Sequence, residues 1–215
     1  MDEPIEAFRA LSTAAVSDAM DRLGLHGACL GIIPLAVGYR IVGRAFTVKY
    51  IPVGVEKGTV GDYIDDVPPG GVVVLDNAGR LDCTVWGDIL TSVAHKREVA
   101  GTVIHGVCRD TAKSLELRYP IFSRGKFMRT GKDRVQLEGI GFPVSLGDVQ
   151  VGPGDIVLGN DDGIVVIPKQ KEGDVLAVAQ SISEAEKRII SEVLKGAHPL
   201  GEARKKYGYH ELQRR

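Results

Sequence analysis

The hydrophobic pattern divides the chain into a region of alternating strands and helices and a second region of short strands. Three apolar runs alternate with two segments of helical spacing, in the order 72–75, 88–98, 102–105, 111–118 and 120–123. Short apolar runs bounded by Gly, Pro or Asp are typical of buried strands, and the longer periodic segments are typical of helices. The order strand–helix–strand–helix–strand predicts a parallel sheet of the α/β class.

The segment that precedes this region adds two helices and a strand. Apolar residues recur at helical spacing over 5–24, which predicts a helix ended by Gly24. Val, Ile, Phe and Tyr dominate 39–53, which predicts a strand with a bend at Gly43. A shorter helix is expected at 60–66, before a Pro-Pro-Gly-Gly turn.

After residue 140 the pattern changes to short apolar stretches separated by Gly-Asp and Pro-Gly turns. They predict strands at 144–146, 149–151, 155–158 and 163–167. This β-rich half resembles barrel or sandwich construction. A long helix is expected at 173–195, followed by a polar tail that forms a short helix or an arm onto a neighbouring subunit.

A length of 215 residues suits one domain. The expected fold class is therefore α/β, with a central parallel core, a β-rich second half and a C-terminal helix. The helix and tail, about 173–215, are expected to pack on the core or on a neighbouring subunit.

Charge, apolar runs and cysteines limit the classes of function. The net charge of −1 provides no field that attracts nucleic acid, and the apolar runs are too short for a membrane-spanning helix. Cys29, Cys83 and Cys108 are odd in number and lack CxxC spacing, which favours reduced thiols. The acidic start of the chain lacks the basic residues of a signal peptide, so we expect a cytoplasmic protein.

Several familiar motifs are absent from the sequence. It contains no GxxxxGK[ST], no GxGxxG after a strand and no GxSxG, so phosphate-loop, dinucleotide and serine-hydrolase functions lack support. The five His form no HExxH or similarly close pair. Carboxylates remain as the expected metal ligands.

Two short segments bring polar groups to the ends of predicted strands. Gly87, Asp88, Ile89 and Leu90 open the helix that leads into the strand at 102–105. Free N–H groups at such a helix start can bind a carboxylate. Asp88 can also hold or deprotonate a metal-coordinated water.

Arg109 and Asp110 lie just past the strand at 102–105, and parallel sheets bind ligands at the carboxyl ends of their strands. Arg109 supplies a planar fork for a carboxylate or an enolate oxygen. Asp110 is a hard oxygen ligand for Mg²⁺, Mn²⁺ or another divalent metal. The alternative is structural, because an Arg-Asp pair or Asp88 alone can also serve as a helix cap and dipole partner.

The spacing of these residues resembles a family motif. Gly87-Asp88, twenty residues and then Arg109-Asp110 resemble the G-D-x20-R-D motif of the RraA-like family. That family includes class II pyruvate aldolases acting on 4-hydroxy-4-methyl-2-oxoglutarate and 4-carboxy-4-hydroxy-2-oxoadipate, and the regulator of ribonuclease activity A. Further similar segments are Ser17-Asp18-Ala19, Pro69 to Asp76, Pro120 to Gly125 and Asn160 to Pro168.

The resemblance implies a swivelling α/β/β domain assembled into homotrimers or hexamers, with active sites between subunits. It implies that Asp110 and waters hold Mg²⁺, which the keto-acid substrate chelates. Arg109 would bind substrate and stabilise a pyruvate enolate, the amides of Gly87 to Leu90 would receive the pyruvyl carboxylate, and Asp88 would act through a metal-bound water. Retro-aldol cleavage and oxaloacetate decarboxylation share that enolate.

The chain departs from the family pattern at two positions. Lys113 stands three positions after Asp110, where the aldolases have an acid, and this departure concerns the named aldol substrates. His105 stands where family members often have Asp. For His105 the alternatives are packing at a strand end or support of a metal ligand.

Four other residues have two interpretations each. Asp161 and Asp162 suit a turn or a contribution to a site across a subunit interface. Cys108 is either a small apolar packing residue or a thiol whose pKa Arg109 lowers. Trp86 either lines the pocket or anchors its loop.

The leading hypothesis is a metal-dependent carbon–carbon lyase, an aldolase or oxaloacetate decarboxylase. The rival is a non-enzymatic regulator that binds a ribonuclease or another protein. A menaquinone methyltransferase lacks support, because no glycine-rich loop for an adenosyl cofactor follows a first strand.

Overall fold

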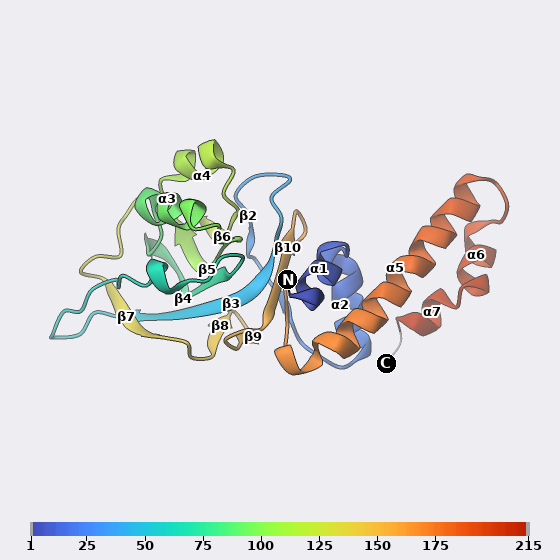
Figure 1. Ribbon diagram of the computed structural model, residues 1–215, viewed down its shortest axis with the longest axis horizontal. Coiled ribbons are helices and arrows are strands. Elements are labelled where there is room, and N and C mark those ends of the chain that lie inside the picture. The colour runs from blue at the N-terminus through green and yellow to red at the C-terminus, as the bar shows by residue number, and fades with distance from the viewer. Residues whose placement is uncertain (1, 214–215) are drawn as a thin grey trace.

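The predicted parallel strands form the centre of a nine-stranded sheet in the computed structural model, which describes residues 2–213 (Figure 1). The prediction of alternating elements is confirmed. In chain order these elements are β3 (Ile41–Pro52), β4 (Val72–Thr84), α3 (Asp88–Lys96), β5 (Gly101–Cys108), α4 (Thr111–Leu117) and β6 (Ile121–Lys126). The carboxyl ends of β4, β5 and β6 therefore meet at one edge, where α3 and α4 begin.

The expected β-rich second half is present, and its strands β7 (Val135–Ile140), β10 (Ile156–Asn160) and β11 (Gly163–Ile167) join the same sheet as the parallel core. Hydrogen bonds with β3 place the later strands antiparallel beside it. The sheet also gains β1 (Ala28–Cys29) and β2 (Ile33–Pro34). The remaining two strands, β8 (Val144–Leu146) and β9 (Val149–Val151), pair only with each other.

The N-terminal region contains two helices where one was expected. α1 (Glu3–Arg9) and α2 (Thr13–Arg22) are separated at Ser12, whose Oγ accepts the amide of Ala15 at 3.1 Å and caps α2. Gly24 follows α2 with a positive φ, as expected for its role in ending a helix.

The structure refines two smaller expectations. Gly43 pairs in register with Val157 within β3, and no bulge interrupts the pairing there. A Cβ there would lie 2.3 Å from the carbonyl oxygen of Gly70, so close backbone approach explains this glycine. The segment 60–66 forms only the short 3₁₀ turn η1 (Ile64–Asp66).

Three hydrophobic clusters fix the layers of the fold. The first includes Trp86, Ile104 and Tyr119 and joins the sheet to the layer of α3 and α4. The second joins α1, α2 and the first part of α5 to β10 and β11, and the third lies beneath the β8–β9 hairpin. Both faces of the parallel strands are thus covered, which accounts for their continuous apolar sequences.

The expected C-terminal helix is confirmed as α5 (Glu172–Leu194), preceded by the turn η2 (Lys169–Lys171). Its outer half leaves the body of the molecule, and α6 (Leu200–Lys206) and α7 (Tyr209–Leu212) return beside it (Figure 1). At the end of α7 the carbonyl oxygen of Leu212 accepts a hydrogen bond from Arg22 at 3.2 Å. We call residues 186–212 the helical arm.

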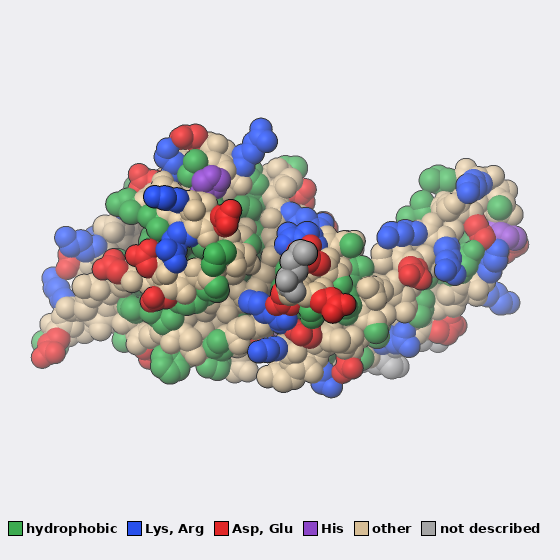
Figure 2. All heavy atoms as spheres, in the orientation of Figure 1, with side chains coloured by type: hydrophobic (Ala, Val, Ile, Leu, Met, Phe, Trp, Pro, Cys, Tyr) green, Lys and Arg blue, Asp and Glu red, His purple; other side chains and the backbone are tan. Residues whose placement is uncertain are grey.

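The surface carries mixed charge. On the face shown in Figure 2, basic and acidic side chains alternate over the body and the helical arm. No helix within residues 2–213 has the length and apolar composition needed to cross a membrane.

Candidate functional site

The two segments singled out in the sequence lie side by side at the carboxyl ends of β4 and β5. β4 leads through Trp86 and Gly87 into α3, and β5 leads through Arg109 and Asp110 into α4. The amide of Arg109 donates a hydrogen bond to the carbonyl oxygen of Trp86 at 3.1 Å, which joins the two loops directly.

Asp110 has an unusual backbone and a side chain that does not cap its helix. Its φ and ψ of 54° and 39° lie in the left-handed region, which non-glycine residues rarely adopt. The carboxylate makes no capping hydrogen bond to α4. Instead its Oδ2 lies 3.1 Å from Nε of Arg109 and 3.4 Å from the amide nitrogen of Asp88, and its side chain is 39% exposed. The Asp110 side chain therefore does not cap α4, and its one hydrogen bond to a helix N-terminus is the long one from the first amide of α3.

Gly87 leaves the space that the Asp110 carboxylate occupies. A Cβ on Gly87 would lie 2.7 Å from Oδ2 of Asp110 and 3.3 Å from Nε of Arg109. Its φ of −142° is open to any residue, so the need for glycine here is one of space.

The N-terminus of α3 presents amides to the same place. The first hydrogen bond within the helix runs from the amide of Thr91 to the carbonyl of Gly87 at 3.0 Å. The amides of Asp88, Ile89 and Leu90 precede it and have no partner inside the helix. The Asp88 carboxylate accepts the amide of Ile89 at 2.8 Å, so Asp88 partly caps its own helix and Ile89 is less available than expected.

Buried polar groups hold this loop in place. Oγ of Thr84 accepts the amide of Trp86 at 3.1 Å and lies 2.7 Å from the carbonyl oxygen of Val107 on β5. The Trp86 indole donates to Thr91 Oγ at 2.9 Å and stacks on Tyr119, with the ring centroids 6.2 Å apart. Because its side chain is only 1% exposed, Trp86 serves mainly as the anchor of the loop.

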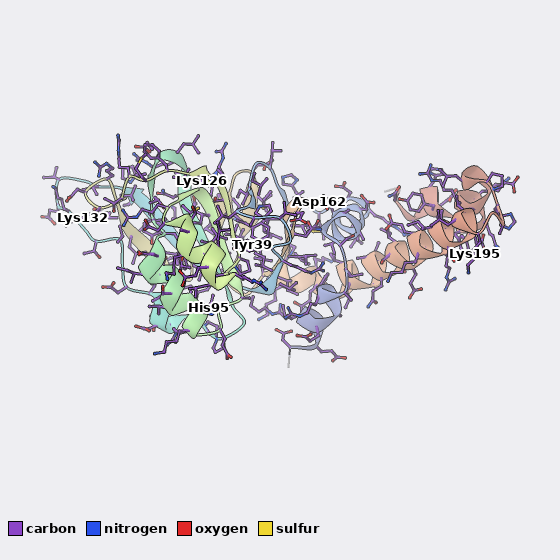
Figure 3. All side chains as sticks on the ribbon, turned by 90° about the horizontal axis from the view of Figure 1, so that it is seen from above. Tyr39, His95, Lys126, Lys132, Asp162 and Lys195 are labelled. Atoms are coloured by element: carbon purple, nitrogen blue, oxygen red, sulfur yellow. The ribbon has the colours of Figure 1, made fainter. Side chains whose placement is uncertain are left out.

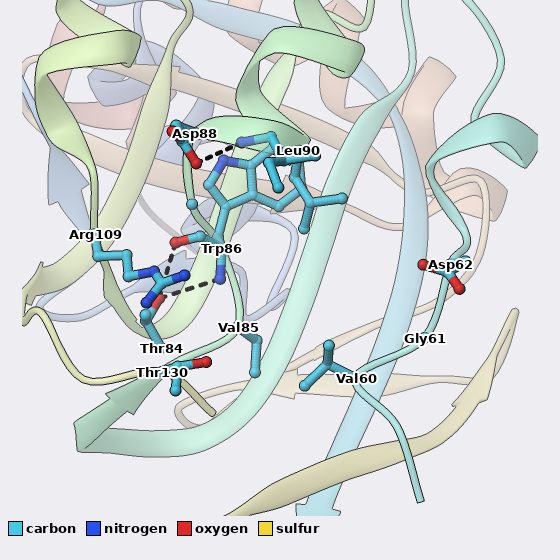
Figure 4. A pocket seen from close by; sticks show the side chains of 12 residues that line it. Val60, Gly61, Asp62, Thr84, Val85, Trp86, Asp88, Leu90, Arg109 and Thr130 are labelled. Atoms are coloured by element: carbon cyan, nitrogen blue, oxygen red, sulfur yellow. Dashed lines mark hydrogen bonds between the residues drawn. The ribbon is translucent and has the colours of Figure 1, made fainter. Parts of the chain in front are cut away.

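Two hollows open on either side of Arg109. The first, which we call the α3 pocket, has a volume of about 220 Å³ and is lined by residues 60–62 and 84–90, Arg109 and Thr130 (Figure 4). The second, which we call the β6 pocket, has a volume of about 300 Å³ and is lined by residues 109–111 and 126–128. Arg109 lines both pockets, and Asp110 lines the β6 pocket.

Two charged residues of these pockets were missed in the sequence. Asp62 lines the α3 pocket from the loop opposite Trp86 (Figure 4), and Lys126 lines the β6 pocket from the end of β6. The sequence signal for Lys126 is its place at the end of the third parallel strand. The sequence carries no comparable signal for Asp62, because only the tertiary fold brings its loop across from α3.

Two other candidates have partners away from Arg109 and Asp110. β5 continues to Cys108, so His105 lies within the strand and not at its expected end, and its Nδ1 is 3.3 Å from Oδ1 of the buried Asp76, as expected for a packed residue. Lys113 Nζ pairs with Glu116 at 2.7 Å on the surface of α4.

The turn residues and the cysteine fit their structural interpretations. Asp161 accepts the amide of Gly38 at 2.7 Å, and Asp162 bonds with Asn160 in the turn between β10 and β11 (Figure 3). Burial raises the pKa of the Cys108 thiol, so the expectation that Arg109 lowers it is wrong. Cys108 is a packing residue of the first cluster.

The side chains near Asp110 suit Mg²⁺ better than a metal that needs several protein ligands. No group of three or more His, Cys, Asp or Glu suited to holding a metal occurs within residues 2–213. Mg²⁺ nevertheless commonly takes one or two protein carboxylates and keeps several waters. The carboxylate of Asp110, which is 39% exposed, does not cap α4 and lines an open pocket, fits such a site.

The chain is similar to known proteins over most of its length. The RraA-like family model, described as Aldolase/RraA, matches residues 13–166. Protein DlpA of Legionella pneumophila is 39% identical over 93% of the chain, which spans only 33% of the length of DlpA. A Halalkalibacterium halodurans protein named "Putative 4-hydroxy-4-methyl-2-oxoglutarate aldolase" is 36% identical over 87% of the chain and 89% of its own length.

A solved structure supports the fold, and its name describes a different activity. Streptomyces coelicolor RraAS2, described as an unusual member of the RNase ES inhibitor RraA protein family, superposes with a TM-score of 0.79 at 26% identity. The match covers 87% of this chain and 95% of RraAS2. The same architecture therefore occurs under both an aldolase name and a regulator name.

Proposed function

Because this chain belongs to the Aldolase/RraA family, we propose that it is a divalent-metal-dependent lyase that cleaves 4-hydroxy-2-oxo diacids, such as 4-hydroxy-4-methyl-2-oxoglutarate, to pyruvate. Oxaloacetate decarboxylation is proposed as a second reaction of the same site. The observation that carries the proposal is the Asp110 carboxylate, which does not cap its own helix α4, is 39% exposed and lies in the space that Gly87 leaves beside Arg109.

Arg109, Asp110 and the amides of α3 have distinct roles in this proposal. Asp110 holds the metal, and bound Mg²⁺ supplies a Lewis acid toward the oxo and carboxylate oxygens of the substrate. The amide of Leu90 binds the carboxylate next to the oxo group, together with the amide of Asp88, whose hydrogen bond to Asp110 is long at 3.4 Å. Arg109, whose Nε lies 3.1 Å from Asp110, places its positive charge where the oxo oxygen becomes negative.

The proposed cleavage is a retro-aldol reaction in which Asp88 accepts the proton. The proton of the substrate 4-hydroxyl passes to Asp88, and the C4–O bond becomes a carbonyl as the C3–C4 bond breaks. The electron pair of that bond moves onto the C2 oxygen as a pyruvate enolate, which then takes a proton at C3. For oxaloacetate the same C3–C4 bond breaks, and the fragment that leaves is carbon dioxide.

Asp88 suits the role of proton acceptor because only one of its carboxylate oxygens is used by the protein. Oδ1 accepts the Ile89 amide at 2.8 Å, which orients the side chain along the rim of the α3 pocket. The other oxygen remains open to solvent and substrate. Asp62, on the opposite wall of the pocket, is the second carboxylate within reach of a bound molecule (Figure 4).

The test is pyruvate release, measured by coupling to lactate dehydrogenase. Wild-type protein is supplied with 4-hydroxy-4-methyl-2-oxoglutarate or oxaloacetate, in Mg²⁺ or in EDTA. We expect activity in Mg²⁺ only, and its loss in Asp110→Ala. Glu184→Ala is the matched control, because it removes an exposed carboxylate from α5 far from the site. Activity that survives both EDTA and Asp110→Ala contradicts the proposal.

The second candidate function is regulation of a ribonuclease, which the name of RraAS2 favours. A regulator would slow RNA cleavage by its partner enzyme without Mg²⁺-dependent pyruvate release. Inhibition that Asp110→Ala leaves unchanged, in a protein without lyase activity, would establish this alternative.

We further propose a cytoplasmic homotrimer or hexamer with the oxo-acid substrate as its small-molecule partner. Light scattering of the purified protein measures the assembly. A monomeric mass contradicts this part of the proposal.

A further inference from the structure

The β6 pocket contains a cationic side chain that the proposed reaction does not use. Lys126 is the last residue of β6 and pairs in register with Cys108, next to Arg109 on the neighbouring strand. Within residues 2–213 its side chain makes no hydrogen bond or ion pair. Arg109 faces Asp110 at 3.1 Å and Lys113 faces Glu116 at 2.7 Å, so among the described residues Lys126 is the cation of the β6 pocket that has no carboxylate partner.

The two pockets differ in charge. The α3 pocket has the carboxylates of Asp62 and Asp88 on its walls, and these repel a second substrate carboxylate. The β6 pocket has Lys126 at its edge and is also lined by Asp110, whose charge Arg109 partly neutralises. An anionic group is therefore accommodated better beside Lys126.

The β6 pocket also has an apolar wall. Phe127 and Met128 line it, and Met128 is 74% exposed although it is a large hydrophobic residue. Its volume of about 300 Å³ corresponds to roughly ten water molecules, since each occupies about 30 Å³ in the liquid. A small branched group ending in a carboxylate fits both this volume and this chemistry.

We propose that the β6 pocket binds the half of the substrate beyond C3, and that Lys126 binds its carboxylate and thereby selects 2-oxo diacids over 2-oxo monoacids. This inference rests on the proposed function, because it places the oxo-acid end at the N-terminus of α3. From there a substrate passes Arg109, which lines both pockets, and extends into the β6 pocket, where Asp110 and Lys126 lie. Lys126 is a specificity-determining residue and takes no part in bond cleavage.

The test uses two unreactive ligands of equal chain length. 2-Oxoglutarate ends in a carboxylate, whereas 2-oxopentanoate ends in a methyl group, and neither has the 4-hydroxyl that cleavage needs. Their dissociation constants are measured by calorimetry in Mg²⁺ for wild type, Lys126→Met and Lys126→Arg. Lys195→Met, at the distant end of α5, is the control for loss of an exposed lysine (Figure 3).

The wild type should bind 2-oxoglutarate about tenfold or more tightly than 2-oxopentanoate, the effect of one charged hydrogen bond. Lys126→Met should abolish this preference and leave 2-oxopentanoate binding unchanged, and Lys126→Arg should retain most of it. A preference that survives Lys126→Met, or a wild type that binds both ligands equally or neither, overturns the inference.

Pyruvate release from 4-hydroxy-4-methyl-2-oxoglutarate separates the two proposals. If the protein shows the Lys126-dependent preference but releases no pyruvate, the role of Lys126 is supported and the proposed activity is contradicted. If it releases pyruvate with the same KM in wild type and Lys126→Met, the activity is supported and the role of Lys126 is contradicted.

Discussion

Gly87 and Asp110 approach each other so closely that a Cβ on Gly87 would lie 2.7 Å from Oδ2 of Asp110. Alanine at position 87 therefore forces the Asp110 carboxylate to move. Since the φ of Gly87 suits alanine, the expected result is at least a tenfold loss of kcat/KM for pyruvate release with little change in Tm. Steady-state kinetics and thermal denaturation of Gly87→Ala measure both quantities.

Gly173→Ala is the control, because a Cβ at this position of α5 meets nothing within 4 Å. It should leave activity unchanged and stabilise α5 by about 0.5–1 kcal/mol. A Gly87→Ala variant with full activity would show that the Asp110 carboxylate can support catalysis from a different position.

The left-handed backbone of Asp110 predicts different stabilities for two inactive variants. Asp110→Gly and Asp110→Ala both remove the carboxylate, but glycine adopts a φ of 54° without strain. Asp110→Gly should be more stable than Asp110→Ala by about 1 kcal/mol in urea denaturation. Equal stabilities would mean that the loop relaxes to ordinary backbone angles once the carboxylate is lost.

The buried hydroxyl of Thr84 should stabilise the loop before α3. Thr84→Val keeps the shape of the side chain but leaves the amide of Trp86 without its acceptor. An unsatisfied buried donor costs about 1–3 kcal/mol, so the urea midpoint should fall by a corresponding amount. Thr84→Ser keeps the hydroxyl and should recover most of the difference, and a serine variant as unstable as the valine variant contradicts this role.

The Cys29 thiol should make stability depend on alkaline pH. Burial, and then the charge of Asp148, raise the pKa of Cys29 from 9.0 to about 12. Between those values the unfolded thiol loses its proton while the folded thiol keeps it. The contribution of Cys29 is therefore full below pH 9 and falls by up to about 1.4 kcal/mol per pH unit as pH rises toward 12.

Urea denaturation at pH 8, 9, 10 and 11 checks this expectation by comparison of wild type with Cys29→Ala. Other groups titrate in both proteins, so the difference in the free energy of unfolding isolates Cys29. A difference that does not change across this range contradicts a buried, protonated thiol.

The sequence predicted the parallel core and its edge because those features depend on local patterns. The apolar runs that begin β4 and β5 are continuous, since both faces of these strands are covered. Parallel connection then brings the ends of β4 and β5 together, which places Gly87 beside Arg109 and Asp110 before any coordinates are known.

The rest depended on interactions between distant segments. β10 pairs with β3 through positions such as Ile156 and Arg44, more than a hundred residues apart, and turn spacing does not reveal that pairing. β7 was missed for the same reason, since it pairs with the far half of β3. The sequence also does not reveal the roles of individual side chains. It does not show that the Asp88 carboxylate accepts the amide of Ile89, or that the Asp110 side chain does not cap α4.

The helical arm should unfold locally before the rest of the molecule. The first half of α5 is buried against α2 through Val175 and Ala179, whereas Leu194, near the tip of the arm, is 81% exposed. Local unfolding at the tip therefore exposes little new apolar surface, and amide protons there should exchange with deuterium much faster than those near Val175. The arm can accordingly fray and re-form while the sheet edge that holds Arg109 and Asp110 stays protected.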